Sequence, residues 1–111
     1  MAEKKNDPAP TARPSAEQMA EWKAKYKKVH EITTEDGFVA VVREPSMVDL
    51  EIAMDKSTKK GARYFDFNRT LYRRCKLWEQ EGMMDDEDRA LELLSAMGSL
   101  GEIREATIKK L

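Results

Sequence analysis

A short apolar run in the middle of the chain constrains the fold more than any other feature. Residues 38–42, Phe-Val-Ala-Val-Val, are rich in β-branched side chains, and Glu35-Asp36-Gly37 before them is typical of a tight turn. Residues 29–34 alternate with a period of two. Together these segments predict a β-hairpin around Asp36-Gly37. Because a lone hairpin is marginal in water, it must pack on helices or join a sheet formed with another copy or another protein.

A helix is predicted before the hairpin. Ser15 and Gln18 form a Ser-x-x-Gln capping box, in which both side chains satisfy free amides of a new helix. Met19, Trp22 and Tyr26 then recur at spacings of three and four, which gives one apolar stripe among lysines. Residues 1–14 contain three prolines and no large apolar side chain besides Met1, so we expect a disordered arm.

Further helices are predicted after the hairpin. Ser46 and Asp49 suit the cap and first turn of a short helix. Its predicted buried stripe is Met47, Leu50, Ala53 and Met54. The acidic residues 85–88 suit the start of another helix, whose apolar arc of about 160° can be clamped between two elements or left partly open to a partner. Residues 103–111 continue the apolar pattern into a docked last helix or turn.

The stretch at 65–75, Phe-Asp-Phe-Asn-Arg-Thr-Leu-Tyr-Arg-Arg-Cys, mixes aromatic rings, arginines and the single cysteine. If Asp66 caps a helix, a turn of about 100° per residue separates these side chains into two faces. The apolar arc then holds Phe67, Leu71, Cys75 and Trp78, and the opposite side holds Arg69, Arg73 and Lys76. We expect Cys75 to be a buried hydrophobe with a poorly reactive thiol.

The fold class predicted by these patterns is α+β. It has an N-terminal helix, one β-hairpin and then a small bundle of three to four helices, all within a single domain at residues 15–111. At 111 residues the chain is too short for two domains.

Composition excludes several classes of function. The net charge of −1 gives no global attraction to nucleic acid or to an anionic membrane, and no apolar stretch approaches the roughly 18 residues of a membrane span or resembles a signal peptide. The sequence shows no paired catalytic carboxylates, metal-ligand cluster, calcium loop or glycine-rich phosphate loop. We therefore expect a cytoplasmic protein that is not an enzyme and needs no cofactor.

Charge is distributed unevenly along the chain. Residues 1–28 carry an excess of Lys and Arg, whereas residues 82–111 carry an excess of Asp and Glu. This polarity suits head-to-tail contacts between copies, and it suits an ordinary solvated surface equally well.

A family resemblance adds to these patterns. The residues that carry it are Arg-Glu-Pro-Ser at 43–46, Phe-Asn-Arg-Thr-Leu at 67–71, Cys75, the acidic break after Gly82, and the ending 102–111. Over roughly residues 20–111 the chain resembles small proteins encoded in phages and prophages of gut bacteria. Their layout is similar to that of tail assembly chaperones of long-tailed phages. Where the pattern has a glycine pair after the cysteine, this chain has residues 76–82, so its helix is expected to run longer.

The resemblance implies a non-catalytic protein that binds the tape-measure or tail-tube protein during virion assembly, in the cytoplasm of the bacterial host. Methionines give adaptable apolar surface for helical ligands, although they also suit a small core, and the hairpin edge could pair between copies. The residues predicted to contact a protein partner are Met83, Met84, Leu91, Leu94, Met97, Arg69, Arg73 and Lys76. One alternative is a structural tail or head-tail connector subunit. The other is a small nucleic-acid-binding regulator that uses the Lys-rich first helix and the stripe of Arg69, Arg73 and Lys76.

Overall fold

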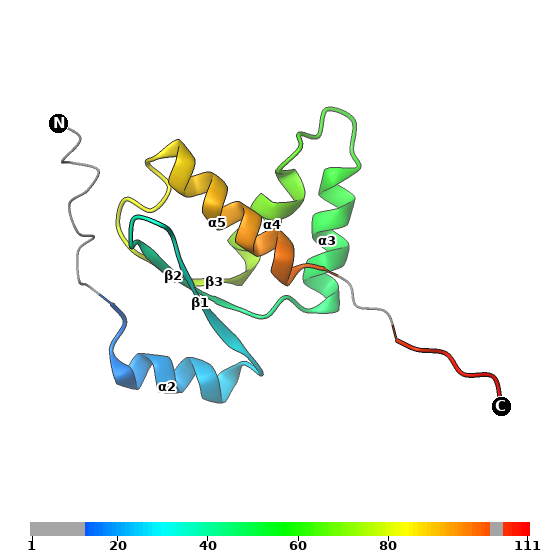
Figure 1. Ribbon diagram of the computed structural model, residues 1–111, viewed down its shortest axis with the longest axis horizontal. Helices are drawn as coiled ribbons and strands as arrows, with labels where there is room; N and C mark the ends of the chain where they lie inside the picture. Colours follow the sequence, from blue (N-terminus) through cyan, green and yellow to red (C-terminus); the bar gives the residue numbers. More distant parts are fainter. Residues whose placement is uncertain (1–12, 103–105) are drawn as a thin grey trace.

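The computed structural model describes residues 13–102 and 106–111. Within them the chain order is α2 (Ala16–Lys25), β1 (Val29–Thr33), β2 (Val39–Arg43), α3 (Met47–Ser57), α4 (Asp66–Cys75), β3 (Lys76–Glu79) and α5 (Glu87–Leu100). The strands form one antiparallel sheet in the order β1-β2-β3. In Figure 1, α3, α4 and α5 gather on one side of the hairpin and α2 lies on the other. The predicted α+β class is confirmed, whereas most of the predicted arm, residues 1–12, lies outside the described residues.

The hairpin forms at the predicted turn. Its ladder runs from Val29 opposite Arg43 to Thr33 opposite Val39. The Thr34 amide donates to the Phe38 carbonyl (2.9 Å) and the Gly37 amide donates to the Thr34 carbonyl (2.9 Å), with Gly37 at a φ of 90°. A three-residue loop whose last residue is left-handed favours glycine at that position.

The hairpin loop is tied to the start of α5 by Arg89. Its Nε donates to Asp36 Oδ2 (3.0 Å), its Nη1 donates to the Gly82 carbonyl (2.6 Å), and its guanidinium carbon lies 3.6 Å from the centre of the Phe38 ring. Burial tends to raise the pKa of Asp36, but hydrogen bonds from Thr34 and Arg89 outweigh it and hold that pKa below its ordinary value. The acidic segment 85–88 starts a helix as predicted, since the Asp86 side chain accepts from the Arg89 amide.

The third strand corrects the sequence prediction. We expected the helix of residues 66–75 to continue past Lys76 and to carry Trp78 on its apolar arc, but α4 ends at Cys75 and Trp78 pairs with Val41 in β3. The Gln80 side-chain oxygen extends this pairing by accepting from the Val39 amide (3.0 Å). The physical reason is that β2 is buried along most of its length, and its second edge needs a partner for its backbone groups.

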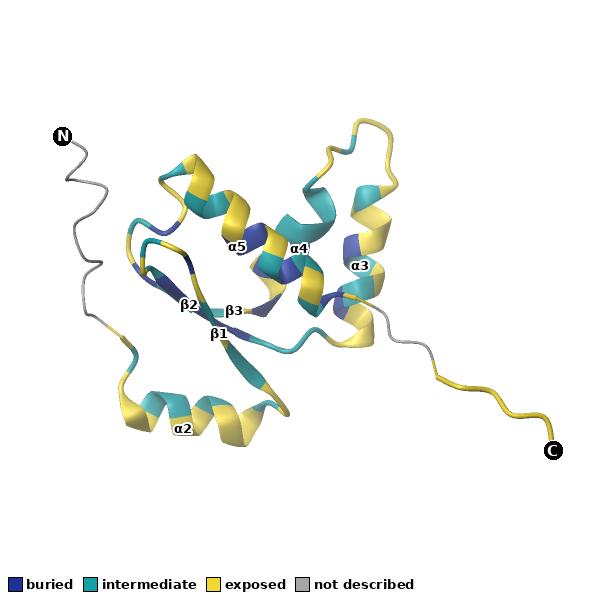
Figure 2. Cartoon of the chain, in the orientation of Figure 1, coloured by how far each residue is buried: buried dark blue, intermediate teal, exposed yellow. Residues whose placement is uncertain are grey.

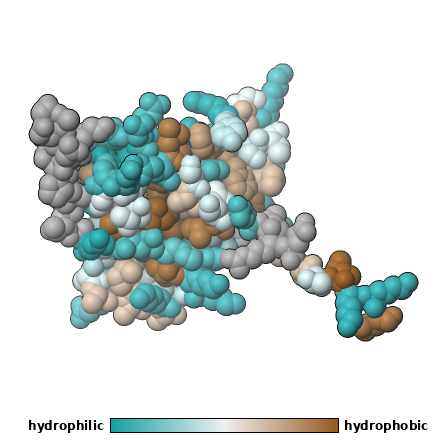
Figure 3. Space-filling view, in the orientation of Figure 1, coloured by the Kyte–Doolittle hydropathy of each residue, from teal (hydrophilic) through white to brown (hydrophobic). Residues whose placement is uncertain are grey.

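The core lies between the sheet and the three following helices (Figure 2). Phe67, Leu71 and Cys75 point into it from α4, as predicted, and Phe67 is partly buried. The buried members of the core are Ala40, Val42, Ala53, Leu71, Tyr72, Cys75, Met83, Leu93, Leu94 and Met97. Figure 3 shows the same division from outside, with hydrophobic side chains gathered in the middle of the molecule and hydrophilic ones around them.

The predicted stripe of α3 is only partly correct. Ala53 is buried and Leu50 packs against the core, but Met47 and Met54 are 74% and 49% exposed. The other buried residue of α3 is Asp49, which is 1% exposed because charged partners surround it. A hydrophobicity pattern cannot identify a carboxylate that is buried with its counter-ions.

Both ends of the described chain depart from prediction. Ser15 caps α2 by accepting from the Gln18 amide, but the Gln18 side chain donates to Glu21 instead of completing the capping box, and α2 has no buried residue. Residues 106–111 are not helical, and Ile108 and Leu111 are fully exposed. Residues 103–105 lie outside the described residues.

Gly101 provides the first test. It follows α5 with an ordinary φ of −86°, and a β-carbon there would lie 2.5 Å from Leu71 Cδ1 and 3.1 Å from Phe67 Cε2. Leu71 is fully buried and cannot swing aside. We predict that Gly101→Ala lowers the free energy of unfolding by about 1–3 kcal/mol, measured by urea denaturation. Without this clash the substitution should stabilise the chain by about 0.4–1 kcal/mol. The exposed Ser99→Ala is the control and should stay near wild type.

Candidate functional site

The position of α4 is fixed by one buried carboxylate. Asp49, in the first turn of α3, accepts from Arg43 Nη1 (2.5 Å) at the end of β2 and from Arg74 Nε (2.7 Å) near the end of α4. It also accepts from the Ser46 amide (2.8 Å), which completes a capping box. The hydrogen bond from Arg43 holds the pKa of Asp49 well below its ordinary value, against the effect of burial. Three elements therefore meet at one charged group.

A substitution at Asp49 tests this network. Asp49→Asn leaves two arginines without their counter-ion, and we predict a loss of about 3 kcal/mol in the free energy of unfolding, at the low end for buried pairs because Arg74 is partly exposed. The ionised Asp49 stabilises the fold above its unfolded pKa of about 3.9, and this contribution is lost as pH falls through the lower folded pKa. The difference in the free energy of unfolding between wild type and variant should be constant above about pH 5 and should decrease below about pH 4. A difference independent of pH in urea denaturation curves would contradict the assignment.

Cys75 lies against the same network and is inert. It is fully buried, and its Sγ lies 3.9 Å from Asp49 Oδ2. Burial raises the pKa of the thiol to about 11, so the thiolate is scarce at neutral pH. The only histidine, His30, contacts Glu44 across the sheet (2.5 Å). These positions agree with the structural role predicted for the cysteine.

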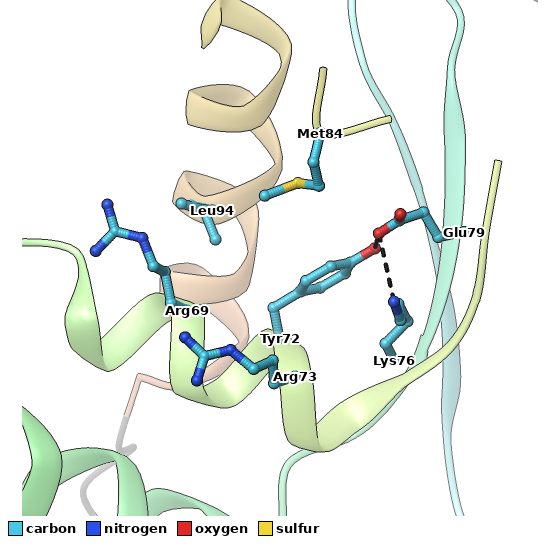
Figure 4. A pocket seen from close by; sticks show the side chains of 7 residues that line it. All are labelled: Arg69, Tyr72, Arg73, Lys76, Glu79, Met84 and Leu94. Carbon is cyan, nitrogen blue, oxygen red and sulfur yellow. Dashed lines mark hydrogen bonds and ion pairs between the residues drawn. The ribbon is translucent and has the colours of Figure 1, made fainter. Parts of the chain in front are cut away.

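The outer flank of α4 forms one wall of a small open pocket. Its volume is about 220 Å³. Figure 4 shows the side chains of Arg69, Arg73, Lys76 and Glu79 around the Tyr72 ring, with Met84 and Leu94 beside it. Tyr72 and Leu94 are buried and form an apolar floor, whereas Met84 is 40% exposed. The pocket therefore combines an apolar interior with a largely basic rim.

Tyr72 and Glu79 hold each other in the pocket. The Tyr72 hydroxyl donates to Glu79 Oε1 (2.7 Å), and Lys76 Nζ lies 3.6 Å from the same oxygen and 5.7 Å from the centre of the Tyr72 ring. Burial, and then the hydrogen bond and charge of Glu79, raise the pKa of Tyr72 well above its ordinary value. The hydroxyl thus stays protonated, and the Glu79 carboxylate is already engaged.

The two arginines on this flank differ in their partners. Arg69 Nη1 pairs with Asp66 Oδ1 (3.0 Å) one turn earlier. Asp66 was expected to cap α4 but is its first residue, and its carboxylate accepts from the Arg63 amide (2.7 Å). Arg73 is exposed and has no ion pair among residues 13–102 and 106–111. Arg73 is therefore the cation on this rim that can bind an incoming carboxylate without breaking an existing ion pair.

The structure brings together five of the residues predicted to contact a partner: Arg69, Arg73, Lys76, Met84 and Leu94. Leu91 does not line the pocket, but it is 40% exposed on α5, one turn before Leu94. Met83 and Met97 are fully buried in the core, so they are not part of any accessible surface. These two methionines fill the core, which was the alternative left open for them.

The sequence missed Tyr72 and Glu79. The spacing of Arg69, Tyr72, Arg73 and Lys76 at three, four and seven residues could have placed Tyr72 on this flank. Glu79 joins them because α4 ends at Cys75 and the chain continues as β3, a change that the sequence pattern did not predict.

Neither a metal centre nor a membrane span appears in the part of the chain that the structure describes. Its residues contain no group of three or more His, Cys, Asp or Glu side chains that could hold a metal ion. No helix formed by those residues is long and apolar enough to cross a bilayer.

No protein-family model, curated protein or solved structure matches this chain. What the pocket can bind is therefore inferred from its own residues.

Proposed function

We propose that this chain is a non-catalytic protein-binding module that acts as a tail assembly chaperone. In this role it holds an apolar helical segment of a tape-measure or tail-tube protein until the tail assembles. The observation that carries the proposal is the pocket on α4, where an exposed methionine lies beside a buried apolar floor and an arginine that has no ion pair among the described residues.

The pocket suits a side chain of a protein better than a small polar metabolite. Small-molecule sites are usually clefts of about 300–1,000 Å³ that enclose most of the ligand, whereas this pocket is open and has a volume of about 220 Å³. Here the Tyr72 hydroxyl and the Glu79 carboxylate are hydrogen-bonded to each other. The apolar floor and the basic rim therefore remain available to contact an incoming side chain. The volume of about 220 Å³ has room for one or two large apolar side chains.

The surface also indicates the chemistry of the client. Leu94 and Met84 can contact apolar anchors spaced by three or four residues on a helix, and the thioether of Met84 adapts to anchors of different shape. Arg73 can pair with an Asp or Glu beside those anchors. The client is therefore an amphipathic helix whose apolar stripe is bordered by acids.

Catalysis is not part of this proposal. The nucleophile candidates near the site are a buried thiol with a raised pKa and a protonated tyrosine. Both features support binding as the role of this surface.

Two matched methionine variants test the proposal. Met84→Ser removes the exposed anchor of the pocket, and Met54→Ser changes a methionine of similar exposure on α3. The full chain should co-purify with the tape-measure or tail-tube protein encoded alongside it. We predict that Met84→Ser reduces the captured client at least about tenfold, the loss expected for one buried apolar anchor. Met54→Ser should capture as much client as wild type.

Four outcomes would contradict this function. Capture of neither protein, or equal loss in both variants, would remove the assigned role of the pocket. Recovery of the protein in purified particles would favour a structural tail or connector subunit. Salt-dependent DNA binding would favour a regulator that uses the exposed lysines of α2 and the stripe of Arg69, Arg73 and Lys76. In that case a plot of log affinity against log salt concentration should have a slope of about −0.9 for each neutralised phosphate.

A further inference from the structure

The surface around the pocket carries both signs of charge. Arg69 and Arg73 lie on the flank of α4, and Glu87 and Asp88 lie in the first turn of α5. Met84 precedes α5 and Leu91 lies on it, and each is 40% exposed. These basic, apolar and acidic side chains form what we call the mixed surface, which consists of Arg69, Arg73, Met84, Glu87, Asp88 and Leu91.

The helical spacing of α5 sets the order of these groups. Glu87, Leu91 and Leu94 are separated by four and then three residues, so they share one face of the helix. Leu94 lines the pocket together with Arg69 and Arg73. Glu87 lies about 10 Å further along α5, since the helix rises about 1.5 Å per residue. The mixed surface is therefore basic at the pocket, apolar in the middle and acidic at the start of α5.

The outer charges of the mixed surface lack partners among the described residues. In the described residues, no ion pair or side-chain hydrogen bond involves Arg73, Glu87 or Asp88. The neighbouring charges are engaged, because Arg69 pairs with Asp66 and Arg89 pairs with Asp36. The unpartnered charges thus mark the two ends of the mixed surface, one of each sign.

We propose that the mixed surface docks a second copy of this chain across a two-fold axis through its apolar middle. In a two-fold interface a residue contacts a different residue of the other copy, and the reverse contact follows by symmetry. Arg73 of each copy then faces Glu87 of the other, Leu91 of both copies packs at the centre, and Met84 packs beside it at the edge of the pocket.

Charge complementarity favours a second copy over a partner of one sign. An acidic partner would attract Arg73 but would repel Glu87 and Asp88. A basic partner would attract Glu87 and Asp88 but would repel Arg73. A partner must carry both signs in the inverse order, and a copy rotated by two-fold symmetry has that order. The pairing stands without the chaperone proposal. If both hold, the second copy covers the pocket and excludes a client.

Charge reversal at the two ends gives a direct test. The test compares Arg73→Glu and Glu87→Arg, each alone and mixed in equal amounts, with Lys56→Glu as the control. Lys56 is an exposed residue in the last turn of α3 without an ion pair in the described chain. Circular dichroism confirms that each variant folds. Mass is measured by sedimentation from about 1 μM to about 1 mM, the range of weak to moderate dimers.

Wild type and Lys56→Glu should form dimers, with affinity that falls as salt is raised. Each charge-reversal variant alone places like charges opposite each other at both contacts, so its dissociation constant should rise at least about tenfold. The equimolar mixture should form a one-to-one dimer, because both contacts between the two different variants again join opposite charges. A monomeric wild type, or a mixture that stays as weak as its components, would overturn the inference.

The test separates this inference from the proposed function. A monomeric wild type whose client capture still depends on Met84 would remove the dimer and leave the chaperone role intact. A dimer that obeys the charge rule and captures no client would support the inference without the chaperone role.

Discussion

The buried carboxylate of Asp49 holds the sheet and the helical bundle together. Its partners come from the end of β2, the start of α3 and the end of α4, so a single charge fixes how the sheet meets the bundle. Arg43 strengthens the junction because its Nη2 also donates to the Arg74 carbonyl (2.8 Å), at the last turn of α4. Hydrogen bonds from two arginines and a backbone amide offset the free-energy cost of removing the Asp49 carboxylate from water.

The same junction decides which side of α4 meets solvent. Arg74 turns toward Asp49, whereas its neighbour Arg73 points about 100° away around the helix and remains exposed. Phe67 and Leu71 lie so close to Gly101 that α4 and α5 pack without room for an added methyl group. Asn68 locks the pair by donating to the Leu94 carbonyl (2.7 Å). The basic flank of α4 is thus held beside the exposed side of α5, and this arrangement creates the mixed surface.

Local signals predicted the parts of this fold that local physics decides. The turn at Gly37, the caps at Ser15 and Ser46 and the acidic start of α5 all follow from neighbouring residues. The strand at 76–79 did not follow, because its pairing with β2 depends on residues more than 30 positions away. The same limit applies to the site. Helical spacing identified Arg69 and Arg73, but Glu79 could be placed in the site only by predicting β3. Asp49 escaped prediction because its partners Arg43 and Arg74 are distant in sequence from each other.

We propose that the mixed surface, and not the exposed methionines of α3, makes the contacts of this protein. The most direct measurement is NMR of the methionine methyl groups, since Met84 lies on that surface and Met47 and Met54 lie on α3. We predict that the Met84 methyl signal shifts as protein concentration rises and again when client is added, while the Met47 and Met54 signals stay in place. Shifts of Met47 or Met54 with an unchanged Met84 signal would contradict the account.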